Sequence, residues 1–183
     1  MKMVQAPLAV LGLLLATGIA AAQAPEVTAE HKVLAGDAGT WKAKMTMYIP
    51  GTDQTIEGEG TEVNTLFANG LWLSSKFEGT FAGQPFEGQG HNGYDPNSKK
   101  YVGSWVDSMS TSVSTMVGEY DDKSNTMTGM MTSKEPTTGE EVVTKSVTVN
   151  KDKNTRIMTM YNKSPETGDE WIKTMVIEYT RVK

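Results

Sequence analysis

Residues 39–51 read GTWKAKMTMYIPG, and this stretch decides the fold. Apolar side chains alternate with polar ones through it, and the run ends in a proline and a glycine. The apolar set is Trp41, Ala43, Met45, Met47 and Ile49, and the polar set is Thr40, Lys42, Lys44 and Thr46. Side chains alternate between the two faces of a β-strand, so each set lies on a face of its own. A Pro-Gly pair favours a chain reversal. The stretch therefore predicts a strand with one dry and one wet face, followed by a turn.

Similar strand-length segments fill the rest of the chain, with no convincing helix between any two of them. We expect ten strands, at residues 40–49, 54–66, 71–81, 85–94, 100–107, 112–120, 126–134, 141–149, 155–162 and 169–182. Turn residues separate most of them, for example Asn69-Gly70 and Gly83-Gln84-Pro85. Regularly spaced short strands of this kind are typical of an all-β protein. The sequence predicts a single up-and-down antiparallel β-barrel of about ten strands.

A membrane-spanning barrel is excluded by the second face of the strands. In the third strand Leu71, Leu73, Phe77 and Phe81 oppose Ser74, Lys76, Glu78 and Thr80. A membrane barrel needs an apolar belt on its lipid side, whereas here the face opposite the apolar one carries charges and hydroxyls.

Glycines occur inside several expected strands, where they weaken the ladder. These are Gly58, Gly60, Gly88, Gly90 and Gly103. Sharp coiling at the corners of the barrel is the expected reason, with close approach of a ligand as the functional alternative.

The first 22 residues indicate a secretory signal peptide. Lys2 precedes an apolar run from Leu8 to Ala22 that ends in small residues. We expect cleavage after Ala22, which leaves residues 23–183 as one domain in the periplasm or outside the cell. Loss of Lys2 moves the formal charge from −5 to about −6, which disfavours nucleic acid and anionic lipid as partners. The chain has 0 cysteines, so disulfides, thiol nucleophiles and zinc-cysteine sites are excluded.

Only one short helix is expected, at residues 29–35. Its large apolar side chains are Val33 and Leu34. We interpret it as a cap over one end of the barrel.

Closure of the barrel is indicated by Gly39, Trp41 and Arg181. In a closed meander the first and last strands are neighbours, so the Arg181 guanidinium can lie over the Trp41 indole and seal the seam. This constellation resembles the closure motif of the calycin group, which includes lipocalins, fatty-acid-binding proteins and nitrobindins. It indicates a fold and no chemistry.

A more specific resemblance extends over the mature chain. It is carried by His31-Lys32-Val33-Leu34, Gly39-Thr40-Trp41, Pro50-Gly51, Gly70-Leu71-Trp72-Leu73, Gly93-Tyr94-Asp95 and Tyr101-Val102-Gly103-Ser104-Trp105-Val106-Asp107. These segments resemble the bacterial family known as domain of unknown function 1579. The resemblance implies a calycin-like barrel and no established activity.

The wider calycin group suggests two ligands that this sequence does not match. Nitrobindin-like proteins hold haem through a histidine late in the chain, and here no histidine follows His91. Fatty-acid-binding proteins hold a carboxylate with an Arg-x-Tyr pair in the last strand, and here the order is reversed in Tyr179-Thr180-Arg181. We therefore predict no cofactor and no metal, and leave carboxylate binding by Arg181 as a minor alternative.

A barrel of ten strands has room for a cavity, since about eight already enclose one small ligand. The leading hypothesis is a binding protein for a small hydrophobic or amphiphilic molecule. Strand parity gives the expected lining as Met45, Met47, Leu71, Leu73, Phe77, Trp105, Met158 and Met160. Methionine suits such a pocket because it is flexible and polarizable. Thioether binding of Cu(I) is the alternative for the paired methionines.

Two further function classes stay open. The first is a non-enzymatic interaction module whose barrel is filled by its own side chains. The second is an enzyme acting inside the barrel, which requires a polar cluster deep in the cavity. The sequence offers only His91 with Asp95, expected at the surface, and Glu57 with Glu59, expected on a solvated face.

Overall fold

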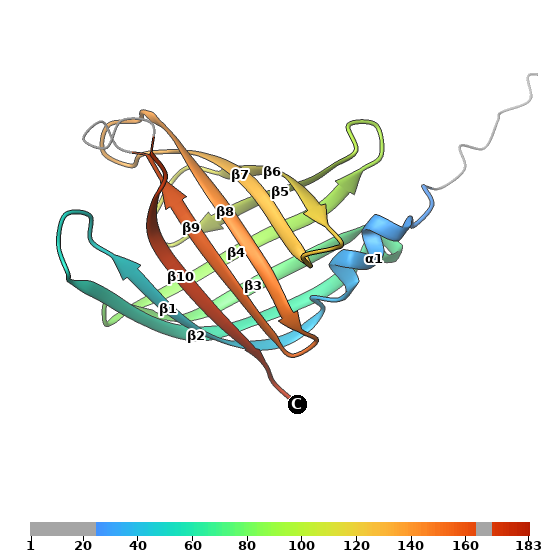
Figure 1. Ribbon diagram of the computed structural model, residues 1–183, viewed down its shortest axis with the longest axis horizontal. Coiled ribbons are helices and arrows are strands. Elements are labelled where there is room, and N and C mark those ends of the chain that lie inside the picture. Colours follow the sequence, from blue (N-terminus) through green and yellow to red (C-terminus); the bar gives the residue numbers. More distant parts are fainter. Residues whose placement is uncertain (1–24, 164–169) are drawn as a thin grey trace, which may run out of the picture.

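The computed structural model describes residues 25–163 and 170–183, and it forms one closed antiparallel barrel (Figure 1). The strands run in chain order around the barrel, and β10 returns to pair with β1. The elements are α1 (Ala29–Ala35), β1 (Gly39–Tyr48), β2 (Thr55–Phe67), η1 (Ala68–Gly70), β3 (Trp72–Phe81), β4 (Gln84–Asp95), β5 (Lys100–Asp107), β6 (Ser114–Asp121), β7 (Thr126–Lys134), β8 (Glu141–Asp152), β9 (Thr155–Asn162) and β10 (Ile172–Arg181). The predicted all-β barrel is thereby confirmed.

The predicted strand boundaries agree closely with the structure where the turn chemistry is strong. Strands β5, β7 and β9 have the expected limits, as does α1. The largest difference within the described residues is at β8, which continues to Asp152 instead of ending at Val149. A bulge between Asn150 and Asp152 absorbs the extra residues, so the ladder to β9 continues past the expected turn. The predicted signal peptide, its cleavage site and the expected start of the last strand at Asp169 lie outside the described residues.

The seam between β1 and β10 closes as predicted. Trp41 and Arg181 are direct cross-strand partners, and the Arg181 guanidinium lies 4.1 Å from the centre of the Trp41 ring. Arg181 also donates hydrogen bonds to the carbonyl oxygens of Gly36, Ala38 and Lys153. The side chain therefore joins the last strand both to the first strand and to the end of α1.

Gly39 is required at this seam for two reasons. Its φ is +124°, a conformation that residues with a side chain rarely adopt, and an added Cβ would lie 2.7 Å from Nη1 of Arg181. The turn that enters β1 thus leaves the space in which the guanidinium lies.

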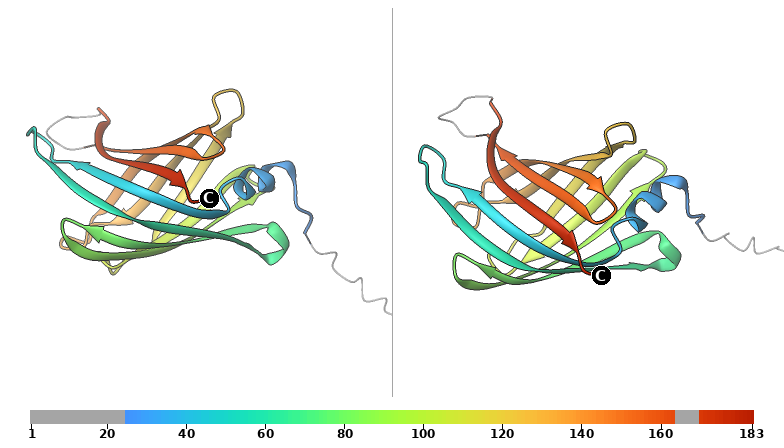
Figure 2. Two further views of the ribbon diagram at one scale, coloured as in Figure 1. Left: turned by 90° about the horizontal axis from the view of Figure 1, so that it is seen from below. Right: turned by 60° about the horizontal axis from the view of Figure 1, so that its bottom comes forward.

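Helix α1 covers one end of the barrel, as expected. Leu34 is buried against Leu73 and Tyr101, and the Tyr101 hydroxyl donates to the Glu30 carbonyl oxygen at 3.2 Å. The C-terminus leaves the barrel near the same end (Figure 2). The hairpin between β1 and β2 lies at the opposite end, away from α1 (Figure 1). No helix among residues 25–163 and 170–183 has the length and apolar character needed to cross a bilayer.

Four of the five glycines expected within strands, all but Gly103, lie against aromatic rings. An added Cβ at Gly60 would lie 2.4 Å from Cζ of Phe77, and one at Gly88 would lie 2.2 Å from Cζ2 of Trp105. The cross-strand registers place these pairs on a diagonal, because Phe77 is opposite Glu62, two residues from Gly60, and Trp105 is opposite Gly90, two residues from Gly88. Each large ring lies across the backbone of its neighbour, where any side chain would collide with it.

Candidate functional site

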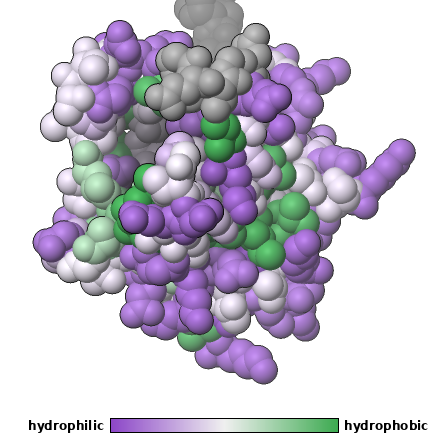
Figure 3. Space-filling view, turned by 60° about the vertical axis from the view of Figure 1, so that its left-hand side comes forward, coloured by the Kyte–Doolittle hydropathy of each residue, from purple (hydrophilic) through white to green (hydrophobic). Residues whose placement is uncertain are grey.

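The barrel encloses a cavity of about 610 Å³, which lies within the size range of small-molecule sites. Helix α1 contributes Val33 and Leu34 to its closed end. Tyr48, Pro50, Asp107 and Met109, at or beyond the opposite ends of their strands, line it as well. Seen from the side away from α1, the surface is hollowed and hydrophobic residues border the hollow (Figure 3). The cavity is thus capped at one end and opens toward the other.

Seven of the eight predicted lining residues line this cavity. They are Met45, Met47, Leu73, Phe77, Trp105, Met158 and Met160. Leu71 does not line it, and the prediction was wrong there. The residue follows η1 and precedes β3, so the alternation of the strand does not extend back to it.

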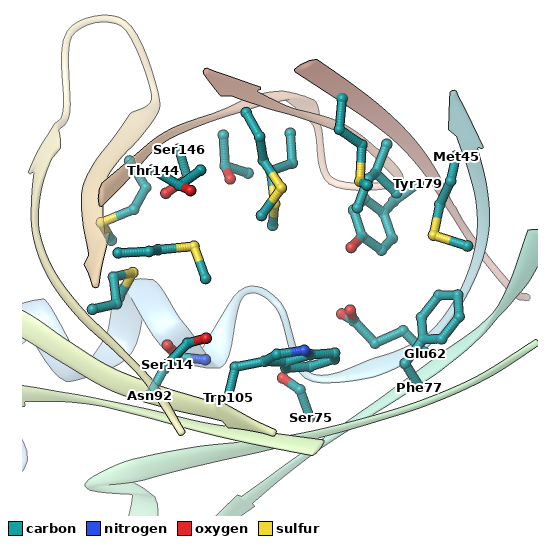
Figure 4. Close-up of a pocket in the computed structure, with 18 of the residues that line it drawn as sticks. Met45, Glu62, Ser75, Phe77, Asn92, Trp105, Ser114, Thr144, Ser146 and Tyr179 are labelled. Atoms are coloured by element: carbon teal, nitrogen blue, oxygen red, sulfur yellow. The ribbon is translucent and has the colours of Figure 1, made fainter. Parts of the chain in front are cut away.

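Methionine is the most frequent residue in the wall, well beyond the four in the predicted set. Ten methionines follow residue 22, and nine of them line the cavity. The additional ones are Met109, Met116, Met127, Met131 and Met175. Only Met130 lies on the outer face, where it is 39% exposed. Figure 4 shows several thioether groups projecting into the same space. This lining is apolar, polarizable and able to adapt to the shape of a guest.

A charged cluster lies at the α1 end of the cavity, and it was not predicted. Arg156 on β9 forms ion pairs with Asp37, at 2.9 Å between Nη1 and Oδ1, and with Glu62 on β2. Arg156 and Glu62 are both buried. The pair with Glu62 reaches across β10 and β1, the two strands that form the seam. The cluster therefore links four neighbouring strands from inside the barrel.

Aromatic rings enclose the Arg156 guanidinium. Its central carbon lies 4.5 Å from the centre of the Trp41 ring and 4.3 Å from that of Tyr179. Burial lowers the pKa of Arg156, but the carboxylates of Asp37 and Glu62 outweigh it and raise the pKa above its usual value. Burial, followed by the Glu62 carboxylate, raises the pKa of Tyr179 well above its usual value. The arginine stays charged and the phenol stays neutral. Glu62 and Tyr179 both point into the cavity (Figure 4).

Asn64 completes the cluster and leaves one atom without a partner. Its Nδ2 donates to the backbone oxygen of Asp37 at 3.1 Å and to Oε1 of Glu62 at 2.8 Å. Both partners are acceptors, so they determine which way the amide faces. Oδ1 of Asn64 is buried and accepts no hydrogen bond. An acceptor of this kind is costly to leave unpaired.

Sequence reasoning could have found this cluster from one signal. Glu62 and Asn64 share a strand face with Gly60, and Arg156 shares one with Met158 and Met160. Charged side chains at positions that parity assigns to a dry interior need partners there. The partners themselves could not be identified, because they come from strands that are not adjacent.

The residues considered for catalysis lie elsewhere. Glu57 and Glu59 are exposed on β2, as expected. His91 packs against Phe67, and its ring does not pair with Asp95, whose carboxylate accepts from Asn97 and Ser98 in the next turn. The suggested pair of His91 and Asp95 was wrong, because Asp95 closes a turn. Among the described residues, no group of three His, Asp or Glu side chains is arranged to hold a metal ion.

One of the similar solved structures, that of Rv2717c, supports the fold. A search of curated proteins gives no significant match. The crystal structure of Rv2717c from M. tuberculosis superposes with a TM-score of 0.64 at 11% identity, covering 86% of this chain and 100% of that one. A redesigned β-barrel gives a TM-score of 0.43 at 15% identity, over 82% of this chain and 96% of that one. The sequence profile of the family described as "Protein of unknown function (DUF1579)" matches residues 26–181. The chain therefore belongs to the DUF1579 family.

Proposed function

We propose that this protein binds a small hydrophobic or amphiphilic molecule inside the barrel. The observation that carries the proposal is the cavity of about 610 Å³, whose large lining side chains are chiefly methionines and aromatic residues and which α1 caps at one end. Ligand pockets in proteins combine a predominantly apolar wall with a few polar groups. This cavity combines large apolar side chains with polar groups, which are the cluster around Arg156 and hydroxyl and amide side chains such as Asn92, Thr144 and Ser146.

The alternative of a side-chain-filled interaction module is weakened by the same cavity. The large residues do not fill the space between them, since Phe77 and Trp105 lie across glycines of the neighbouring strand. Packed in this way, the two rings lie against the barrel wall and leave the middle of the interior open. An interior kept open in this way favours binding over a purely structural core.

An enzyme acting inside the barrel is the second candidate, and one observation favours it. A carboxylate, a guanidinium and a phenol converge at the closed end, from Glu62, Arg156 and Tyr179. The carboxylates of Asp37 and Glu62 are nevertheless paired with Arg156, so neither is free to act as a base. Binding therefore ranks first.

Export to the periplasm or the exterior forms part of the proposal. It rests on Lys2 and the apolar run from Leu8 to Ala22. Cell fractionation followed by N-terminal sequencing tests it. A mature chain that begins at Gln23 is the expected result, and an uncleaved cytoplasmic chain would contradict it.

The binding proposal is tested by extracting the natively purified protein with organic solvent and identifying the released molecules by mass spectrometry. The control is a pair of variants on β8. Ser146→Phe fills the cavity, where Ser146 is buried, whereas Val143→Phe adds the same ring on the exposed outer face. We expect a reproducible apolar ligand from the wild type and from Val143→Phe, and little or none from Ser146→Phe. Equal recovery from all three would contradict binding in the barrel, and a chemically altered ligand would favour the enzyme.

A further inference from the structure

We propose that the cavity selects amphiphiles whose polar end is a hydrogen-bond donor without negative charge, such as a hydroxyl or an ammonium group, and that it disfavours carboxylates. The inference rests on the proposed function and specifies its ligand class. It comes from the charges at the closed end of the cavity, from the engagement of Arg156 and from the free acceptor of Asn64.

The charges of the cavity wall are mostly negative. Among the described lining residues three are acidic and one, Arg156, is basic. Asp37 and Glu62 lie with Arg156 at the closed end, and Asp107 lies at the open end. Asp107 accepts from the Trp105 indole and from the Met109 amide. A ligand carboxylate would lose its hydration in the barrel and meet a surplus of like charge there.

Arg156 is already engaged and cannot serve as a carboxylate receptor. Its two terminal nitrogens pair with Asp37 and Glu62, and Trp41 and Tyr179 lie within cation–π distance of its guanidinium. Nε of Arg156 has no partner, but it is buried and offers one N–H. An arginine that recognises a carboxylate does so with two parallel hydrogen bonds. Here both terminal nitrogens of Arg156 are already paired with carboxylates of the protein itself.

Asn64 is the residue that favours a ligand with a hydrogen-bond donor. The residue is 4% exposed, lines the cavity and holds its Nδ2 against two acceptors, so its unpartnered Oδ1 requires a donor. Its direct cross-strand partner, Ser75, is another buried lining residue and adds a hydroxyl beside it. A ligand hydroxyl or ammonium can donate to these groups, whereas a carboxylate has no proton to give.

The test uses three amphiphiles of equal chain length: decanol, decylamine and decanoate. Each is titrated at neutral pH against the full mature chain that holds the uncharged fluorescent dye N-phenyl-1-naphthylamine, and displacement of the dye is measured. We expect decanol and decylamine to displace the dye at concentrations about tenfold lower than decanoate. Decanoate that binds as tightly as decanol, or more tightly, overturns the inference. If neither the dye nor any amphiphile binds, the proposed function itself fails.

Two variants connect the selectivity to the named atoms. Asn64→Leu removes the free acceptor together with the two hydrogen bonds that Nδ2 donates, and we expect it to weaken decanol severalfold while leaving decanoate unchanged. Asn92→Leu is the matched control, since Asn92 also lines the cavity but lies away from the cluster (Figure 4). Glu62→Gln removes a negative charge beside Arg156, and we expect it to raise the affinity for decanoate. Selectivity that is identical in Asn64→Leu and the wild type would overturn the assignment to Asn64.

Discussion

Trp41 and Arg181 face each other across the seam of the barrel, with the guanidinium 4.1 Å from the centre of the indole ring. The contact joins the first strand to the last. Because Arg181 also donates to three backbone carbonyl oxygens, one side chain holds together β1, β10 and the end of α1. The closure of the barrel is therefore concentrated at a few atoms, and it can be tested by substitution.

Arg181→Met removes the cation–π contact and the charged hydrogen bonds while keeping most of the apolar stem. We expect the free energy of unfolding to fall by about 2–4 kcal/mol, since each of these interactions is worth roughly 1–2 kcal/mol. Urea denaturation, monitored by tryptophan fluorescence, measures the free energy of unfolding. The control is Lys183→Met, an identical change in charge at an exposed residue two positions later. Equal stability of the two variants would show that Arg181 does not hold the seam.

Arg156→Met tests the internal cluster. It leaves the carboxylates of Asp37 and Glu62 without their cation, and removal of one partner of a buried ion pair typically costs about 3–5 kcal/mol. The triple variant Asp37→Asn, Glu62→Gln, Arg156→Met is expected to recover a large part of that loss, because no unpaired charge stays buried. Thermal and urea unfolding give both values. A triple variant less stable than Arg156→Met would refute the explanation, and Lys151→Met on the exposed part of β8 serves as the control.

Gly60→Ala tests whether the glycines make room for rings. The new Cβ would lie 2.4 Å from Cζ of Phe77, and overpacking of this kind costs about 1–3 kcal/mol. Combining it with Phe77→Leu should restore part of the stability, because the smaller side chain vacates the position. A double-mutant cycle on the free energies of unfolding measures the coupling. Strictly additive effects would mean that the ring and the glycine do not interact.

Much of this architecture could be predicted from the sequence, for identifiable reasons. The turns and the alternation give the strands, and the neighbouring positions of the first and last strands give the contact of Trp41 with Arg181. Parity alone assigned Met45, Phe77 and Met158 correctly to the interior. Leu71 failed because parity was extended into a segment that is not a strand.

The charged cluster and the role of the glycines were beyond such reasoning. Arg156 meets Glu62 across two intervening strands, so the contact depends on side-chain reach and barrel curvature, which alternation does not encode. The packing of Phe77 over Gly60 depends on the cross-strand register, and register requires knowing how each turn is built.

Alkaline pH is expected to destabilise the protein through its buried phenols. Burial, followed by the Glu30 carboxylate, raises the pKa of Tyr101 to about 12 from the usual 10, and the pKa of Tyr179 is also raised. The native state then holds these protons more tightly than the unfolded chain does. The resulting stability is complete below pH 10 and is lost as the pH rises toward 12. Urea unfolding across this range measures the decline.

Tyr101→Phe provides the control for the alkaline transition. The variant cannot ionise at this position, so its free energy of unfolding should fall less steeply above pH 10. Absorbance of the phenolate form reports the ionisation directly. A wild-type slope identical to that of Tyr101→Phe would contradict a contribution from this residue.

Oxidation should convert the apolar cavity into a polar one. Hydrogen peroxide turns methionine into its sulfoxide, which is polar and larger. We expect Met109, at 62% exposure, to react before Met45, at 4%, and we expect apolar dye to bind about tenfold more weakly once the interior residues are modified. Peptide mass spectrometry gives the order of reaction, and bound ligand should slow it. Unchanged dye binding by a folded, fully oxidised barrel would contradict the proposed lining.

The thioether wall has an evolutionary consequence. Nine unbranched, flexible methionine side chains shape the cavity, and they stand on a continuous hydrogen-bonded barrel. Exchanging single methionines for branched or aromatic residues can change the shape of the cavity while the backbone stays in place. Related barrels can thus diverge in what they carry through small inward-facing changes, with the framework inherited intact.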